Sequence, residues 1–369
     1  MTLSPDLPRP DHAERRDRLR EALLEQEVPG VVVTSSVNVR WLTGFSGTNG
    51  QLLVLPGAVL LVTDDRYEER ARSEAPDVDV ATERDWAALV VERCADAGLD
   101  EVGFESDGLT HAQGEDLAEA LDDRGIDAVA LRDLVQDLRE VKDAAELGLL
   151  AAACAITDEA FTALLAHVVP GRTERELRRI LLRTMEDLGA EGPAFDPIVA
   201  GGPHSAIPHH HAGDRPLARG DLLKIDFGAR VEGYHADMTR TVSLGPVADD
   251  ELGRVHDIVR EAQSAGVAAA TAGAAVSAVD AACRDVITAA GYGERFLHGT
   301  GHGVGLEIHE APWVSREAAG SLAAGTVITV EPGVYLPGRG GVRIEDTVAV
   351  TADGPARRLT TAPRELLRL

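Results

Sequence analysis

Two segments with a hairpin pattern each carry a pair of carboxylates. In residues 222–242, Asp226 and Asp237 interrupt apolar, strand-like runs. A turn centred between Val231 and Glu232 would place the two aspartates directly opposite each other, on the same face of the sheet. Two like charges side by side in an apolar strand are unfavourable unless a cation lies between them. The pattern therefore predicts a cation site on this hairpin.

Residues 327–346 repeat the arrangement. Glu331 and Glu345 lie symmetrically about a glycine-rich turn centred on Gly338. Two carboxylate pairs in one region bring about four negative charges, which two divalent cations would neutralise. A neutral imidazole would complete the ligand set, and His302 is the candidate. The two hairpins together predict a site for two metal ions.

His302 lies in the stretch HGTGHGVGLEIHEAP, residues 298–312. Its alternating glycines let a ligand or another backbone approach closely. The stretch has no Gly-x-Gly-x-x-Gly pattern and no Lys-Ser/Thr, and it opens no helix, so a phosphate-binding loop is disfavoured. Oxygen-rich ligation with one histidine differs from a structural zinc site. We expect Mn²⁺, with Co²⁺, Zn²⁺ or Fe²⁺ as alternatives.

Three further side chains are candidates for binding a substrate or stabilising charge next to such metals. The reaction would need a proton shuttle, a role that a ligand glutamate can take, and groups that stabilise a developing oxyanion. His209 and His309 are candidates for the latter. The alternatives are an ordinary strand histidine at 309 and a surface loop, His209–His211, that binds adventitious metal. Arg343 could orient a carboxylate or form a plain salt bridge.

The composition excludes several other classes of function. The formal net charge of −26 disfavours nucleic acid and anionic membrane surfaces as partners. No uninterrupted apolar run reaches the roughly 18–20 residues of a membrane span, and residues 1–26 lack the apolar core of a secretory signal. The three cysteines are odd in number and far apart. We therefore expect a cytoplasmic protein.

Hydrophobic periodicity predicts two domains, 1–138 and 139–369. In the first we expect an α/β alternation: helices at 12–27, 85–97 and 114–124, and strands at 30–34, 51–55, 59–63 and 102–104. The glycine-bearing stretch 41–50 is interpreted as a turn between strands. In the second, capping boxes at Asp143/Glu146 and Thr173/Glu176 begin two helices. Further helices are expected at 249–272 and 276–290, with strands in the remainder.

At this point the sequence resembles the pita-bread metallopeptidases, specifically the aminopeptidase P and prolidase branch. The resemblance covers nearly the whole chain. It rests on Ile225-Asp226-Phe-Gly with Gly233-Tyr-His-Ala-Asp237, on Gly299-Thr-Gly-His302 through His309-Glu, on Val330-Glu331-Pro-Gly, and on Arg343-Ile-Glu345-Asp346. It implies an α+β protein, with a pita-bread catalytic domain at 139–369 preceded by a smaller α/β creatinase-type domain at 1–138.

The resemblance also implies roles for these residues. Asp226 and Asp237 would bind one metal, Asp237 and Glu345 would bridge both, and His302 with Glu331 would complete the ligands of the second metal. The activity would be hydrolysis of the Xaa-Pro bond, at the amino terminus of peptides or in dipeptides. Glu331 would be the proton shuttle. His209 and His309 would bind substrate and the tetrahedral intermediate, and Arg343 would orient substrate or support a ligand.

Some points stay open at this stage. After Pro208 the chain has His-His-His-Ala-Gly where relatives often show His-His-Arg-Pro, so the substrate preference is open. There is no decisive carboxylate clamp to separate a dipeptidase from an aminopeptidase. His210, His211 and His298 have no assigned role, and a homodimer is expected by resemblance only. A creatinase-like amidinohydrolase working without metals and a non-catalytic protein-binding module are the alternatives; the complete ligand set disfavours both.

Overall fold

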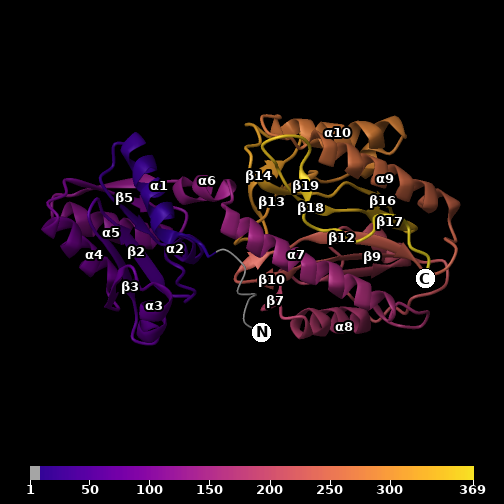
Figure 1. Ribbon diagram of the computed structural model, residues 1–369, viewed down its shortest axis with the longest axis horizontal. Helices are drawn as coiled ribbons and strands as arrows, with labels where there is room; N and C mark the ends of the chain where they lie inside the picture. Colours follow the sequence, from indigo (N-terminus) through magenta and orange to yellow (C-terminus); the bar gives the residue numbers. More distant parts are fainter. Residues whose placement is uncertain (1–8) are drawn as a thin grey trace. The chain divides into compact units, whose positions relative to one another are not determined.

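The computed structural model describes residues 9–369, which divide into two compact units, Arg9–Arg139 and Glu140–Leu369 (Figure 1). Each unit has its own hydrophobic core, and each is described by itself below. Residues 1–8 of the expected first domain lie outside the described residues.

The amino-terminal unit is an α/β structure around a six-stranded sheet of order β4-β3-β2-β1-β5-β6. Strand β2 is antiparallel to both β1 and β3, and the other pairs are parallel. The strands are β1 (Val31–Val33), β2 (Gly50–Val54), β3 (Val59–Thr63), β4 (Asp79–Thr82), β5 (Glu101–Glu105) and β6 (Asp127–Leu131). The helices are α1 (His12–Glu25), α2 (Ser36–Thr43), α3 (Glu68–Glu74), α4 (Trp86–Asp96), α5 (His111–Asp122) and α6 (Leu134–Glu140). The expected α/β alternation is confirmed.

The predicted turn at 41–50 is wrong at its beginning. Trp41 lies in the last turn of helix α2, which ends at Thr43 and is capped by Gly44 with φ 84°. The Trp41 ring is fully buried, and the Arg15 guanidinium lies 4.9 Å from its centroid. Arg15 also donates a 3.0 Å hydrogen bond to the Trp41 carbonyl. A helix of only eight residues is too short to show a clear helical period, so contacts with α1 rather than a sequence pattern identify it.

The carboxy-terminal unit contains four long helices and several small sheets. The helices are α7 (Ala144–Leu165), α8 (Glu174–Asp187), α9 (Asp250–Ala269) and α10 (Val276–Ala289), with short 3₁₀ turns η1 (Gly202–Ala206) and η2 (Gly293–Arg295). The strands are β7 (Gly192–Pro193), β8 (Ile198–Gly201), β9 (Leu222–Phe227), β10 (Ala229–Val231), β11 (Tyr234–His235), β12 (Met238–Ser243), β13 (Gly301–Gly303), β14 (Glu310–Val314), β15 (Val327–Val330), β16 (Gly333–Leu336), β17 (Gly340–Arg343), β18 (Asp346–Ala349) and β19 (Arg357–Arg358).

Both predicted capping boxes are present. The Asp143 carboxylate accepts from the Glu146 N–H at 2.8 Å, and Glu146 accepts in return from the Asp143 N–H at 3.1 Å. Thr173 and Glu176 form the same pair at the start of α8. Among residues 9–369, α7 is the one helix long and apolar enough to cross a membrane. Its buried side chains, including Phe161 and Leu164, belong to the core of this unit, which accounts for its apolar character.

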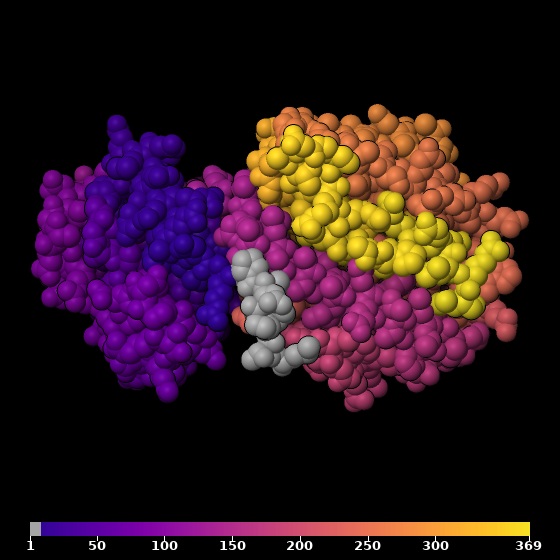
Figure 2. Space-filling view, in the orientation of Figure 1, coloured from indigo at the N-terminus to yellow at the C-terminus, as the bar shows by residue number. Residues whose placement is uncertain are grey.

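Two helix pairs cover two sets of strands in this unit. Helices α7 and α8 pack over β8, β9 and β12, and α9 with α10 packs over β15, β17 and β18. The last residues of the chain, yellow in Figure 2, run across the surface of the unit. They are held to the end of β12, where the N–H of Leu369 donates to the Ser243 carbonyl at 2.9 Å. The carboxylate-bearing strands therefore lie between packed helices.

The two acidic hairpins differ in how well their register was predicted. In the second, Gly333 pairs with Arg343 and Val330 with Asp346, so Glu331 and Glu345 do oppose each other about Gly338. In the first, Asp226 pairs with Thr239 rather than with Asp237, so the prediction is wrong by two residues. The N–H of Ala236 donates to the Ala229 carbonyl, which places the tight turn one residue later than expected. An error of two residues preserves the alternation of faces.

The glycines around His302 allow three strands to approach closely. A Cβ at Gly301 would lie 2.0 Å from the Thr329 carbonyl oxygen, and one at Gly303 would lie 2.0 Å from that of Ala311. Both obstacles are backbone atoms of neighbouring segments, so neither can rotate away. The close approach that the sequence predicted is therefore an approach of backbone, between β13 and its neighbours β14 and β15.

Replacing Gly303 by alanine is expected to destabilise the protein by about 1–3 kcal/mol or more, because the new methyl group overlaps a backbone oxygen. Gly253→Ala is the matched control. Gly253 lies in helix α9 with open space around it, and alanine there should stabilise by about 0.5–1 kcal/mol. Urea unfolding of both variants measures the difference. Equal stabilities would contradict the close packing of β13.

Candidate metal centre

All eight predicted site residues line one cavity of about 520 Å³ in the carboxy-terminal unit. They are His209, Asp226, Asp237, His302, His309, Glu331, Arg343 and Glu345. They come from separate strands and loops, so the fold brings together residues up to 136 positions apart. The volume lies within the range of about 300–1,000 Å³ that is typical of small-ligand sites.

The first aspartate pair is buried at the end of the β9–β12 ladder. Asp226 is 7% and Asp237 5% exposed. Asp226 lies opposite Thr239, whose hydroxyl donates to a Glu345 oxygen at 2.6 Å. Thr239 therefore connects the first hairpin to the second, and the two carboxylate pairs share one site.

The second pair lies where two short ladders meet. Glu331 follows β15 and Glu345 precedes β18. The Glu345 backbone is fixed because its N–H donates to the Thr239 carbonyl at 3.1 Å and its carbonyl accepts from Arg240. The Arg240 guanidinium is in turn paired with the fully buried Asp346 at 2.6 Å. This buried pair holds the two hairpins together directly behind the site.

His302 is oriented for ligation. Its Nδ1 lies 2.9 Å from the Gly303 carbonyl, which can only accept, so Nδ1 carries the proton. The unprotonated Nε2 then faces the carboxylates, 3.6 Å from Asp237 Oδ2 and 3.5 Å from Glu331 Oε1. Burial lowers the pKa of His302 to about 4, so the imidazole is neutral at physiological pH. A neutral ring with a fixed tautomer is the form that binds metal.

Several of these buried carboxylate groups lack the hydrogen-bond donors or positive charges that would offset the cost of burying them. Burial, together with the negative charges of neighbouring carboxylates, raises the pKa values of Asp237 and Glu345 well above their usual range. Burial also raises the pKa of Glu331 to about 7. Among the described residues, Asp226 Oδ1, Asp237 Oδ1 and Glu345 Oε1 are buried without a hydrogen-bond partner.

These orphaned oxygens fit divalent cations. Ligand atoms of Asp237, His302 and Glu345 lie within 4.8 Å of one another, close enough to share an ion. Carboxylate oxygens with one imidazole nitrogen suit a hydrolytic divalent metal. An ion would supply the charge and the partner that each orphaned oxygen lacks.

Arg343 lies among the carboxylates. It is 3% exposed, its guanidinium donates to Asp226 Oδ2, and its Nε lies 3.9 Å from Glu331 Oε2. It also donates to the Thr239 hydroxyl at 3.0 Å. These contacts favour support of the ligands over a contact with substrate.

His209 and His309 lie at the cavity wall and are both exposed. The His309 ring is 4.4 Å from the His302 ring and stacks with Trp313 at 6.3 Å. His309 directly precedes β14 and is not part of a strand. The alternative interpretation, an ordinary histidine within a strand, is therefore wrong. An exposed imidazole beside a candidate ligand is available to a bound substrate.

The sequence reasoning missed Lys224 and Tyr335. Lys224 is fully buried, and its Nζ donates to the carbonyls of Ile207 and Pro208 at 2.7 and 3.1 Å. Because these carbonyls directly precede His209, Lys224 fixes the segment that carries it. Burial and the charge of Arg343 lower the pKa of Lys224 to about 6. Alternation along β9 could have revealed it, since residues 224 and 226 share a face.

Tyr335 connects His298 to the site. Its hydroxyl lies 2.8 Å from His298 Nε2 and accepts from Arg343 at 3.0 Å. His298 Nδ1 lies 2.7 Å from the Gly299 carbonyl and must donate to it. Nε2 therefore accepts from Tyr335. The unassigned His298 lines the same cavity and is connected to Arg343 through the Tyr335 hydroxyl.

Comparison with known families agrees with this geometry. Residues 148–352 match the model of metallopeptidase family M24, and residues 15–141 match the creatinase/prolidase N-terminal domain. The chain belongs to metallopeptidase family M24. The predicted pita-bread resemblance and the predicted fold class are confirmed, and divalent metal ions are the cofactors that this family and the buried ligand groups support.

Relatives of this M24 chain match it over nearly its full length. An uncharacterized peptidase of Bacillus subtilis is 36% identical over 96% of this chain and 99% of the relative. The Xaa-Pro dipeptidase of Pyrococcus furiosus is 36% identical over 96% and 99%. Among solved structures, a Xaa-Pro dipeptidase from Bacillus anthracis has a TM-score of 0.93 at 38% identity, covering 97% and 100% of the two chains. An X-Pro aminopeptidase from Thermotoga maritima has a TM-score of 0.87 at 36% identity, covering 96% and 99%.

Proposed function

We propose that this M24 peptidase hydrolyses the Xaa-Pro bond of dipeptides, with two divalent metal ions bound by Asp226, Asp237, His302, Glu331 and Glu345. The observation that carries the proposal is the set of buried, orphaned carboxylate oxygens grouped with an oriented neutral imidazole in one cavity. Full-length relatives named Xaa-Pro dipeptidase support the choice of substrate.

In the proposed arrangement Asp226, Asp237, His302, Glu331 and Glu345 would hold the two ions. Bound divalent cations would supply Lewis-acid activation of water and of the scissile carbonyl. The remaining chemistry belongs to the chain. Proline presents a tertiary amide without an N–H. As in any amide hydrolysis, its nitrogen must be protonated as the bond breaks, because it leaves as an amine.

Glu331 is the candidate for that proton transfer. Its side chain is 17% exposed and faces the cavity. A ligand glutamate beside the ions can take up a proton and release it during the reaction. In this proposal Glu331 takes the proton from the attacking water and delivers it to the proline nitrogen, while His209 and His309 donate to the developing oxyanion.

An assay with paired substrates tests the proposal. Xaa-Pro dipeptides and Xaa-Pro-Yaa tripeptides are offered to protein loaded with Mn²⁺, the metal that we propose, with Co²⁺, Zn²⁺ and Fe²⁺ compared in parallel. Cleavage of the dipeptide with little cleavage of the tripeptide supports a dipeptidase. Preferential cleavage of the tripeptide would replace it by an aminopeptidase, and cleavage of neither would overturn the proline assignment.

Replacing His309 by alanine is expected to lower kcat/KM for the preferred substrate by about 10²-fold, the effect of losing one oxyanion donor. His211→Ala is the matched control, because His211 is exposed on the same cavity wall but has no proposed role. Steady-state kinetics at equal metal content measures both. Similar losses in the two variants would remove His309 from the proposed machinery.

We also infer a cytoplasmic homodimer that acts on short proline-containing peptides. Three buried cysteines without disulfides, Cys94, Cys154 and Cys283, support a reducing environment. The dimer rests on the family resemblance. Light scattering on the purified protein tests it, and a monomeric mass at assay concentrations would contradict it.

A further inference from the structure

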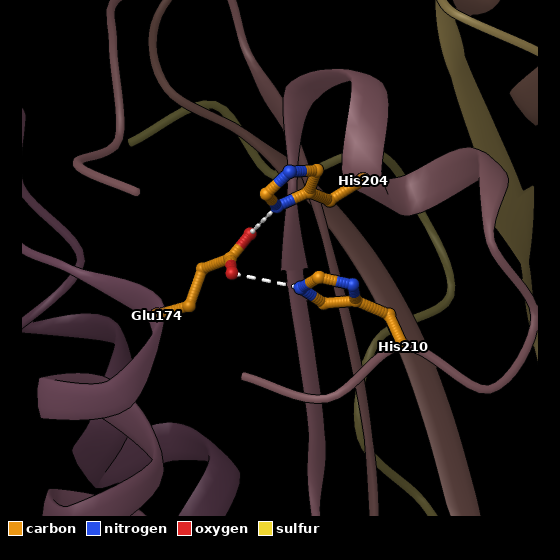
Figure 3. A group of neighbouring side chains, drawn as sticks. All are labelled: Glu174, His204 and His210. Atoms are coloured by element: carbon orange, nitrogen blue, oxygen red, sulfur yellow. Dashed lines mark hydrogen bonds and ion pairs between the residues drawn. The ribbon is translucent and has the colours of Figure 1, made fainter. Parts of the chain in front are cut away.

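Glu174, His204 and His210 form a second group of potential ligands outside the proposed catalytic centre (Figure 3). Glu174 begins helix α8, His204 lies in η1, and His210 follows Pro208 in the next loop. In Figure 3 the two imidazole rings point to different oxygens of the one carboxylate. None of these residues belongs to the ligand set proposed above.

The distances bring one nitrogen of each ring to Glu174. His204 Nδ1 lies 2.9 Å from Oε1, and His210 Nε2 lies 2.8 Å from Oε2. The two ring centroids are 4.4 Å apart. Donor atoms around a tetrahedral zinc ion lie about 3.3 Å from one another, given metal–ligand bonds of about 2.0–2.1 Å. The two nitrogen–oxygen distances would therefore lengthen by about half an ångström on ligation, and each nitrogen would give up its proton to the solvent. All ligand atoms of the group already lie within 4.8 Å of one another.

The carboxylate is held firmly and in its charged form. Its side chain is fully buried, and it also accepts the backbone N–H groups of Gly201 at 2.8 Å and Gly213 at 3.0 Å. Burial alone would raise the pKa of Glu174, but these hydrogen bonds and those from the two histidines lower it overall. A fixed anionic oxygen beside two imidazoles is the donor combination that borderline divalent metals prefer.

The group is also accessible. The His204 side chain is 36% exposed and that of His210 is 12% exposed, whereas Glu174 lies beneath them. The two histidines therefore place the group at the surface of the unit, with Glu174 at its buried end. The formal net charge of −26 raises the local concentration of cations around the chain.

We propose that Glu174, His204 and His210 form a separate binding site for a divalent transition-metal ion of the Zn²⁺ class. The site would be independent of the catalytic centre, and it does not rest on the proposed peptidase activity. His210 lines the cavity and directly follows His209. An ion there would therefore tie the loop that carries His209 to helix α8.

A double variant that keeps the hydrogen bonds but removes the ligands tests the site. In His204→Asn the amide nitrogen replaces Nδ1, and in His210→Gln it replaces Nε2, so both donors to Glu174 remain. Amide nitrogens do not coordinate zinc. Equilibrium dialysis against Zn²⁺ should show one fewer zinc ion per chain in the H204N/H210Q variant than in the wild type, since both keep the same catalytic ligands.

His211→Asn is the control for weak binding by loop histidines, and it should bind as much zinc as the wild type. Zn²⁺ should also raise the melting temperature of the wild type more than that of the double variant. Circular dichroism checks that the double variant is folded. Equal zinc stoichiometry in the wild type and the double variant would overturn the proposal and leave the group as a hydrogen-bonded brace. A loss as large in His211→Asn would overturn it as well.

Discussion

Replacing Glu331 by glutamine should lower kcat for the preferred proline substrate by about 10²–10⁴-fold, the range for removing a general acid–base. Glutamine keeps the size of the side chain and one oxygen, but it cannot carry the proton. The effect should fall on kcat more than on KM, because proton transfer belongs to the transition state. Stopped assays with Xaa-Pro and Xaa-Pro-Yaa peptides measure it.

Glu331 is also a proposed metal ligand, so the metal content must be measured alongside the rate. Glu310→Gln is a useful control, because Glu310 is an acid of the same unit that pairs with Lys142 at 2.7 Å and is not among the cavity-lining residues. A fully metal-loaded E331Q enzyme with near wild-type kcat would show that another group transfers the proton.

The symmetry of residues around turns predicted much of the proposed centre. Alternation within strands indicated which carboxylates share a face, and it did so even in the first hairpin, where the register is wrong by two residues. The error arose because the turn is tighter and later than its polar residues indicated: Glu232 and Gly233 adopt φ values of 46° and 80°. Local backbone conformations of this kind are hard to predict from residue types.

Contacts between distant elements could not be predicted. Glu174 was visible only as part of a helix start, and nothing in the sequence connects it with His204 and His210. Lys224 differs, because its place two residues before Asp226 put it on the same face of β9. The backbone carbonyls before His209 accept its hydrogen bonds. Their position depends on how η1 and the following loop fold over that strand. Patterns reveal which face a residue occupies, whereas tertiary packing decides what it meets there.

Replacing Asp237 by asparagine should have opposite effects on activity and on the stability of the metal-free fold. We expect kcat/KM and metal affinity to fall by more than about 100-fold, since one of the proposed metal ligands is lost. In the metal-free protein the same change removes the cost of burying this carboxyl group, which must either stay charged beside Glu345 and Asp226 or take up a proton. That variant should melt at a higher temperature than the metal-free wild type, by about 2–4 °C for each kcal/mol of repulsion relieved.

Asp346→Asn is the matched control, because Asp346 is equally buried but paired with Arg240, Gln263 and Thr360. It should destabilise the protein with or without metal. Differential scanning calorimetry of metal-free and Mn²⁺-loaded samples separates the two aspartates. A metal-free D237N protein that melts below the wild type would contradict the view that the carboxylates repel one another.

The dependence of stability on pH follows from the same charges. The pKa of Glu331 is raised to about 7 in the fold, and those of Asp237 and Glu345 are raised well above their usual range, so the metal-free folded state binds more protons than the unfolded state. This contribution to stability is complete below about pH 4, where the unfolded groups are also protonated, and it is lost as the pH rises through about 7. Relative to metal-free D237N, the metal-free wild type should therefore lose stability between pH 5 and 8, and calorimetry at several pH values measures the difference. The comparison cancels Lys224 and His302, whose lowered pKa values act in the opposite direction in both proteins. Bound metal should reduce the loss in the wild type, because the cations compensate the ionised carboxylates.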